Sequence, residues 1–163
     1  MKIEEILIKI RNSDNFEVKE PCGFPKIIGN HKIPEDVKKF YSLCGGINCY
    51  VKYGAFPLTI LEPSKIKLAN LALIGEQVET DISSSWYLIV DAEDGNFISI
   101  DFDSKRCGWC YESFEYSHGI KGNCPIIAKS FTELLMHIFS YSGDYFFWKD
   151  ENIKQYGDAY DML

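Results

Sequence analysis

The residues best suited to chemistry form an acidic cluster in the middle of the chain. Its members are Asp91, Glu93, Asp94, Asp101 and Asp103. Neighbouring carboxylates can bind a metal ion or act as acid and base in hydrolysis. However, their spacing does not match an EF-hand loop, and aspartate is common in turns, which accounts for Asp94 and Asp103. The cluster therefore favours an acidic surface, with a metal-dependent enzyme as the alternative.

Two of the six cysteines, Cys107 and Cys110, have the spacing of redox and zinc motifs. A thioredoxin-type site needs its first cysteine at a helix N-terminus, where the thiolate is stabilised, but this pair runs into a strand-like segment. A zinc site needs a second pair, and Cys44 with Cys49 matches the usual ligand spacing poorly. We therefore expect unreactive thiols, with zinc binding and redox chemistry as the alternatives.

The three histidines, His31, His118 and His137, are scattered along the chain. Catalysis by histidine needs a partner group within hydrogen-bond reach, and no motif supplies one. The chain also lacks a glycine-rich phosphate loop and a nucleophile elbow. We therefore predict that the protein is not an enzyme and has no catalytic residue, no metal site and no cofactor.

A hairpin over residues 86–102 is the element that must position the acidic cluster. Asp94 and Gly95 separate two β-rich runs, and Asp-Gly in that place is a strong hairpin signal. Because successive side chains of a strand point to opposite sides of the sheet, the sequence predicts two faces for this hairpin. The first is an apolar core face with Trp86, Leu88, Val90, Ile98, Ile100 and Phe102. The second is a mixed, partly wet face with Tyr87, Ile89, Asp91, Phe97, Ser99 and Asp101.

The rest of the chain predicts helices on either side of a run of strands. Apolar residues at helical spacing mark helices over residues 2–12 and 33–44, with Gly45-Gly46 as a left-handed cap. Ser130 and Glu133 form a capping-box pattern that starts a last helix. The predicted fold is a single α+β domain with two N-terminal helices, a largely antiparallel sheet of about five to six strands and a C-terminal helix.

The tail combines an aromatic run at residues 145–148 with an acidic stretch. We expect residues 143–163 to be an extension packed on the same domain as residues 1–142. A partner-binding or dimerising segment is the alternative, because aromatic residues are enriched at interfaces.

The net charge of −7 argues against nucleic-acid binding and suits a basic protein partner. The N-terminus has a helical stripe where a signal peptide would have an unbroken apolar run. No segment approaches the roughly 20 apolar residues of a membrane span. We therefore expect a cytoplasmic protein without a membrane or nucleic-acid partner.

Several motifs in the same order resemble those of the SUKH superfamily, which includes the yeast Smi/Knr cell-wall regulators and many bacterial immunity proteins. The segment Ile33-Pro34-Glu35-Asp36-Val37-Lys38-Lys39-Phe40-Tyr41, followed by Gly45-Gly46, resembles the signature near the start of that domain. The Trp86 strand with its Asp94-Gly95-Asn96 turn, the strand Gly108-Trp109-Cys110-Tyr111 and the helix start Ser130-Phe131-Thr132-Glu133-Leu134-Leu135 are similar to later family motifs. The resemblance covers roughly residues 2–141 and departs from the family at Cys110 and in the tail.

The resemblance implies a non-catalytic immunity protein that binds and neutralises a polymorphic bacterial toxin, often a nuclease. The expected partner is a cognate, basic toxin, and the protein itself would be a monomer or homodimer. A regulatory or scaffold binding module of the same fold is the alternative. The predicted partner-binding residues are Trp86, Asp91, Asp94, Gly95, Asn96, Asp101 and Glu112.

Overall fold

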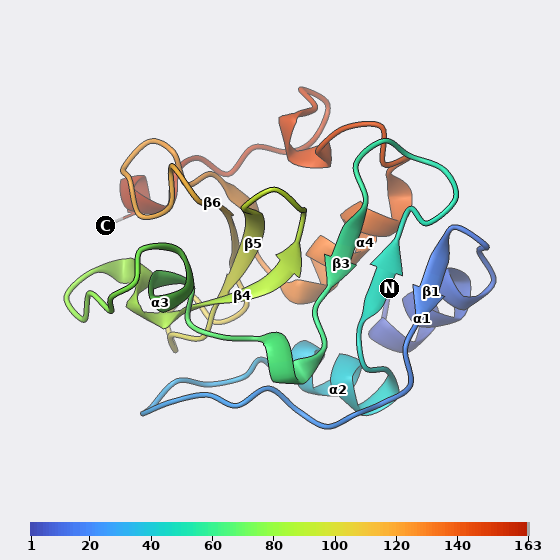
Figure 1. Ribbon diagram of the computed structural model, residues 1–163, viewed down its shortest axis with the longest axis horizontal. Coiled ribbons are helices and arrows are strands. Elements are labelled where there is room, and N and C mark those ends of the chain that lie inside the picture. The colour runs from blue at the N-terminus through green and yellow to red at the C-terminus, as the bar shows by residue number, and fades with distance from the viewer. Residues whose placement is uncertain (163) are drawn as a thin grey trace.

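One seven-stranded antiparallel sheet forms the centre of the computed structural model, which describes residues 1–162 (Figure 1). Its strands are β1 (Phe16–Val18), β2 (Ile47–Cys49), β3 (Leu58–Ile60), β4 (Trp86–Asp91), β5 (Asn96–Asp101), β6 (Cys110–Phe114) and β7 (Ile126–Ala128). Their order in the sheet is their order in the sequence, and every neighbouring pair is antiparallel. Antiparallel neighbours can be joined by tight turns without a crossover, so the hairpin β4–β5 lies in the middle of a continuous meander.

Three helices pack together on one side of this sheet, behind it in Figure 1. They are α1 (Ile3–Arg11), α2 (Glu35–Leu43) and α4 (Phe131–Ser140). Each buries one stripe of apolar residues, as helical periodicity predicts. In α2 this stripe is Val37, Phe40 and Tyr41, and Cys44 continues it beyond the helix end. A short fourth helix, α3 (Ala69–Leu73), packs against β4.

The predicted α+β class is confirmed, but the sheet has seven strands where about five to six were expected. The additional strand β1 lies between the two predicted N-terminal helices, where the sequence predicted no strand. Its three residues pair with β2, with Phe16 opposite Cys49 and Val18 opposite Ile47. Three residues are too few to show a period of two, so pairing with β2 is what defines this strand.

The predicted faces of the central hairpin are partly wrong, because β4 contains an irregularity. The register shifts between Leu88 and Val90, so Trp86 pairs with Asp101 while Val90 pairs with Ile98. A bulge of this kind moves the residues before it to the opposite face relative to those after it. The face expected to be partly wet is largely buried, and Asp101 is fully buried.

Two helix ends also differ from expectation. Cys44 is extended (φ −156°) and so ends α2 without the predicted left-handed cap, although Gly46 has φ +122°. At the start of α4, Ser130 Oγ accepts the amide of Glu133 at 3.1 Å, as predicted. The side chain of Glu133 reaches the amide of Lys129 at 2.8 Å, one residue further back than a standard capping box.

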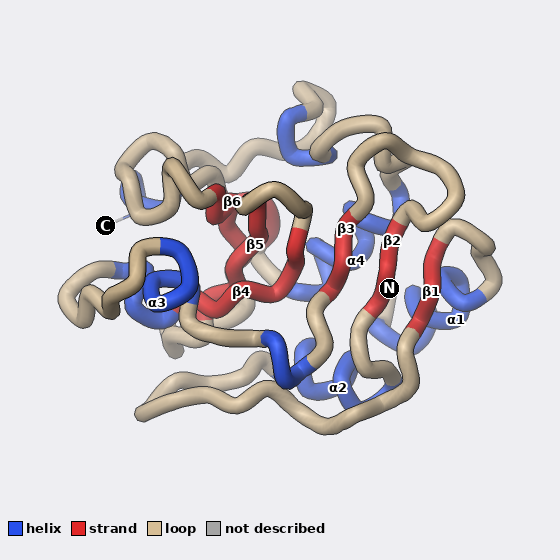
Figure 2. The backbone as a smooth tube through the Cα atoms, in the orientation of Figure 1, coloured by secondary structure: helices blue, strands red, loops and turns tan. Residues whose placement is uncertain are grey.

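The aromatic run of the tail is buried. Phe146, Phe147 and Trp148 are each less than one-tenth exposed, and Phe147–Lys149 forms a single 3₁₀ turn, visible at the top of Figure 2. The ring of Phe146 stacks on Trp148 at 4.8 Å and contacts Phe56 at 5.2 Å. Further along, Ala159 donates its amide to the carbonyl of Cys124 at 2.9 Å.

No helix within residues 1–162 has the length and apolarity needed to cross a membrane.

Candidate partner-binding surface

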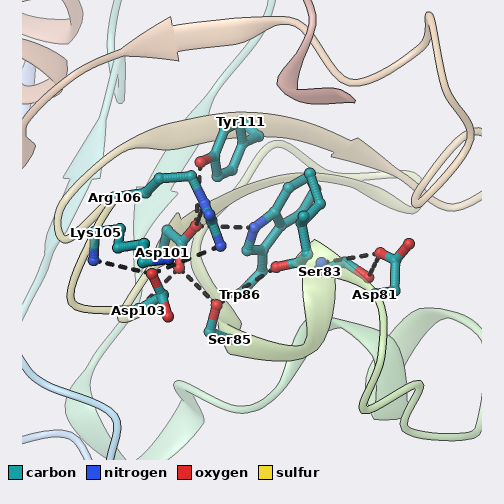
Figure 3. A network of polar contacts seen from close by, with 10 residues as sticks. Asp81, Ser83, Ser85, Trp86, Asp101, Asp103, Lys105, Arg106 and Tyr111 are labelled. Carbon is teal, nitrogen blue, oxygen red and sulfur yellow. Dashed lines mark hydrogen bonds and ion pairs between the residues drawn. The ribbon is translucent and has the colours of Figure 1, made fainter. Parts of the chain in front are cut away.

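The carboxylate of Asp101 is the centre of a buried polar network (Figure 3). One oxygen, Oδ1, accepts hydrogen bonds from Ser85 Oγ at 2.6 Å and from the amide of Asp103 at 2.8 Å. The other, Oδ2, accepts from Arg106 Nε at 2.9 Å, Tyr111 OH at 3.1 Å and Trp86 Nε1 at 3.2 Å. Buried carboxylates are stable only when such donors replace water. The network therefore fixes β4, β5, β6 and the turn before β6 to one another.

Arg106 supplies the positive charge that this carboxylate needs. Burial lowers the pKa of Arg106, but the charge and the hydrogen bond of Asp101, with smaller contributions from Tyr111 and Asp103, together outweigh burial and raise the pKa overall. Burial and the same carboxylate raise the pKa of Tyr111, so the phenol stays a hydrogen-bond donor. The indole of Trp86 stacks on Tyr111 at 4.0 Å and closes the network on the other side. Both carboxylate oxygens of Asp101 thus accept hydrogen bonds from within the fold, which gives this residue a positioning role.

Glu112 lies beneath the tail. Its side chain is 6% exposed, and Oε2 accepts the indole N–H of Trp148 at 2.5 Å and pairs with Lys149 Nζ at 2.8 Å. These two contacts attach residues 148–149 to β6. Because Trp148 and Lys149 cover it, the carboxylate of Glu112 is not part of the free surface.

The turn of the hairpin, in contrast, projects from the sheet. The amide of Asn96 donates to the carbonyl of Glu93 at 2.9 Å, and both central residues of this turn, Asp94 and Gly95, have positive φ (51° and 78°). This geometry is the predicted Asp-Gly turn. Glu93 also has positive φ (63°), and its amide donates to Asp91 Oδ1 at 2.8 Å. The local hydrogen bonds hold the turn in one shape.

Four carboxylates gather at this turn, and we call them the acidic edge: Asp91, Glu93, Asp94 and Glu115. Glu115 follows β6 and lies against the turn, because its amide donates to the carbonyl of Gly95 at 2.8 Å. An added Cβ on Gly95 would lie 2.4 Å from Glu115 Oε2. Among the described residues no cation pairs with any of the four carboxylates. The four side chains therefore form a local concentration of acidic groups that no cation of the described chain neutralises.

Aromatic side chains lie at the same end of the sheet as the acidic edge, because the pairing of Thr59 with Asp91 brings the start of β3 beside the end of β4. Phe56 precedes β3 and meets Tyr145 of the tail edge-on at 5.4 Å. Tyr145 is about half exposed, and Tyr53 in the same β2–β3 loop is two-thirds exposed. The amide of Phe56 donates to the carbonyl of Gly143 at 2.9 Å, which joins this loop to the tail. Exposed aromatic rings next to unpaired charge are typical of protein-binding surfaces.

The structure divides the seven predicted binding residues into two groups. Asp91, Asp94, Gly95 and Asn96 lie together at the exposed turn, and their role in binding stays a prediction. Trp86, Asp101 and Glu112 are buried and present almost no surface to a partner. Glu115 was missed by the sequence analysis. The antiparallel pairing of Asn96 with Phe114 places the next residue, Glu115, beside the turn, and the predicted order of strands could have indicated this.

The cysteines and histidines do not converge on a site in the part of the chain that is described. Its six cysteines are free thiols, and no group of three or more His, Cys, Asp or Glu residues is placed to hold a metal ion. Burial raises the pKa of Cys110, so this thiol is a weaker nucleophile than a free cysteine. His118 is also buried, and its Nε2 lies 2.7 Å from Asn70 Oδ1.

Comparisons with known proteins give one family and one relative. Residues 26–137 match the model of the SMI1/KNR4 family (SUKH-1). The whole chain is 36% identical over 163 residues to a Bacillus subtilis (strain 168) protein named immunity protein YokJ, of which the alignment covers 98%. No solved structure matches the chain.

Proposed function

Because this chain belongs to the SMI1/KNR4 family (SUKH-1), we propose that it is an immunity protein that neutralises a cognate bacterial toxin by binding it. The observation that carries the proposal is the relative named immunity protein YokJ, which aligns with the chain from end to end. The chain is not an enzyme, in keeping with this family of toxin-neutralising proteins. Neutralisation then depends on an interface that covers or distorts the toxin.

The acidic edge is the surface proposed to meet the toxin. Its unpaired carboxylates attract a positively charged surface and accelerate encounter with it. The partner proposed is a nuclease toxin, because a protein that binds the phosphate backbone carries clustered lysine and arginine. Blocking such a basic surface would keep nucleic acid away from the toxin. Tyr145 and Tyr53 supply exposed rings that can anchor the contact.

Two of the predicted partner-binding residues, Asp101 and Glu112, are buried and support this surface from within the fold. Asp101 joins the base of the hairpin to β6 through its hydrogen bond with Tyr111. Glu112 holds Trp148, which follows Tyr145 by three residues in the tail. A surface held rigid before binding loses less conformational entropy when the complex forms. Asp101 and Glu112 are therefore proposed as positioning residues of the interface.

The remaining expectations are part of the same proposal. Residues 1–142 would form the SUKH-like unit and residues 143–163 an extension of it. The family match at residues 26–137 supports that boundary. The protein would act in the cytoplasm as a monomer or homodimer, without contact to membrane or nucleic acid, and its net charge of −7 supports the last point.

Co-expression tests the proposal directly. The test uses a polymorphic toxin whose gene lies beside the gene for this protein, and the C-terminal domain of that toxin is expressed under an inducible promoter. Growth should be rescued by this protein and not by the variant Glu93→Lys/Glu115→Lys. The control Glu76→Lys/Glu79→Lys changes the net charge equally at exposed positions outside the edge and should still rescue. Lack of rescue by the unaltered protein, together with stable binding to a host regulator, would favour the scaffold alternative.

A further inference from the structure

The long connection between β1 and α2 forms an extended strap, residues 19–34, along the lower side of Figure 1 and toward α3. Its ends are held by main-chain hydrogen bonds, from Lys19 to Gly46 at 3.0 Å and from Lys32 to Phe102 at 2.8 Å. Between them, Tyr87 OH accepts the amide of Ile28 at 3.1 Å and lies 2.8 Å from His31 Nδ1. The strap is thus fixed to β4 through one buried tyrosine.

An apolar groove of about 330 Å³ lies between this strap and α3. Its apolar lining consists of Ile28, Ile66, Leu68, Leu71, Ala72 and the ring of Tyr87. Ile28 from the strap and Leu71 from α3 are each about half exposed, while Tyr87 is 1% exposed. Exposed apolar side chains that line a hollow gain free energy when a partner removes them from water.

The charge of this groove is opposite to that of the molecule as a whole. Lys26 and Lys67 are its charged lining residues, and no carboxylate of the described chain lines it. Neither lysine forms an ion pair within residues 1–162. A chain with a net charge of −7 thus presents an apolar groove flanked by free cations.

We propose that the groove between the strap and α3 is a second docking surface, which binds an acidic peptide segment of a partner protein through one apolar side chain. The apolar side chain would lie between Ile28 and Leu71, and the flanking carboxylates would pair with Lys26 and Lys67. This surface is separate from the acidic edge and opposite to it in charge, so the two select different parts of a partner or different partners.

An NMR titration of the full chain tests this surface without the toxin. The probe is the peptide acetyl-Glu-Asp-Leu-Phe-Asp-Glu-amide, compared with acetyl-Lys-Lys-Leu-Phe-Lys-Lys-amide and acetyl-Glu-Asp-Ser-Ser-Asp-Glu-amide. The first peptide should shift the amides of residues 26–28, 66–68 and 71–72 in a saturable way. The other two should bind at least about tenfold more weakly, since the second peptide lacks the carboxylates and the third lacks the apolar side chains. Equal shifts with all three peptides, or no shifts at these residues, would overturn the proposal.

Variants give the second arm of this test. Leu71→Asp should weaken the first peptide about tenfold or more, whereas Ile8→Asp, at a comparably exposed apolar position on α1, should leave its affinity unchanged. Lys26→Glu/Lys67→Glu should weaken it similarly, with Lys121→Glu as the control. Shifts of the same amides on concentrating the protein alone would assign the groove to a second copy and would also overturn the proposal.

Discussion

Asp101 and Arg106 form an ion pair of 2.9 Å in which the side chain of Asp101 is fully buried and that of Arg106 is 21% exposed. The pair joins the end of β5 to the turn that leads into β6. Ser85, Trp86 and Tyr111 donate further hydrogen bonds to the same carboxylate. Removing one member of such a pair leaves the other without a partner in a low-dielectric environment.

The first prediction concerns this ion pair. Asp101→Ala should lower the free energy of unfolding by about 3–5 kcal/mol, because Arg106 loses its main partner and four other donors lose their acceptor. Urea denaturation checks this value. Asp103→Ala, whose carboxylate is 3.7 Å from Arg106 and more exposed, should cost less than about 1 kcal/mol. An Asp101→Ala protein of normal stability that no longer binds toxin would make Asp101 a contact residue and contradict its positioning role.

The second prediction concerns the attachment of the tail. Trp148→Phe keeps one aromatic ring but removes the N–H that donates to Glu112 and part of the buried ring volume, so the protein should lose about 1–3 kcal/mol of stability. Hydrogen exchange should become faster at residues 146–150 than in the unaltered protein. Lys149→Met removes only the exposed partner of Glu112 and should have a smaller effect. Unchanged exchange in Trp148→Phe would show that aromatic packing alone holds the tail.

The third prediction concerns pH. Burial lowers the pKa of His118 to about 4, against 6.5 for the free side chain, despite the opposing charge of Asp81. The unfolded chain therefore takes up a proton between pH 6.5 and 4 that the folded chain does not. Stability should fall as the pH decreases through this window, by up to about 3 kcal/mol from this residue.

Chemical denaturation of the protein and of His118→Gln at pH 7, 6, 5 and 4 measures this contribution. The variant will differ in absolute stability, so the slope with pH is the informative quantity. It should be shallower in the variant. Parallel slopes would assign the acid sensitivity to carboxylates and contradict the buried, neutral state of His118.

Local patterns in the sequence predicted the helices and the central turn. The stripe of Val37, Phe40 and Tyr41 follows from helical periodicity, and the turn at Asp94 and Gly95 follows from the positive φ that glycine accepts. Each of these features depends on residues close in the chain. The order of the predicted helices and strands gave the α+β class, which the structure confirms.

Pairing across the sheet could not be predicted in the same way. The irregularity between Leu88 and Val90 places Trp86 opposite Asp101. The pattern of apolar and polar residues in this segment does not indicate where such an irregularity occurs. The contact of Trp148 with Glu112 joins residues 36 positions apart. Carboxylates that look equivalent in the sequence thus become a buried group at Asp101 and a free one at Asp94.

The central claim, that the acidic edge binds the toxin, is tested by the affinity of one variant. Glu93→Gln/Glu115→Gln removes two charges and preserves the size of the side chains, and Glu76→Gln/Glu79→Gln, at exposed positions outside the edge, is the matched control. Isothermal titration calorimetry with the catalytically inactivated toxin domain, at low and at high salt, measures Kd. We predict a Kd at least about tenfold higher for the edge variant at low salt, a smaller difference at high salt and no change in the control. An edge variant that retains the Kd and salt dependence of the unaltered protein would contradict the account.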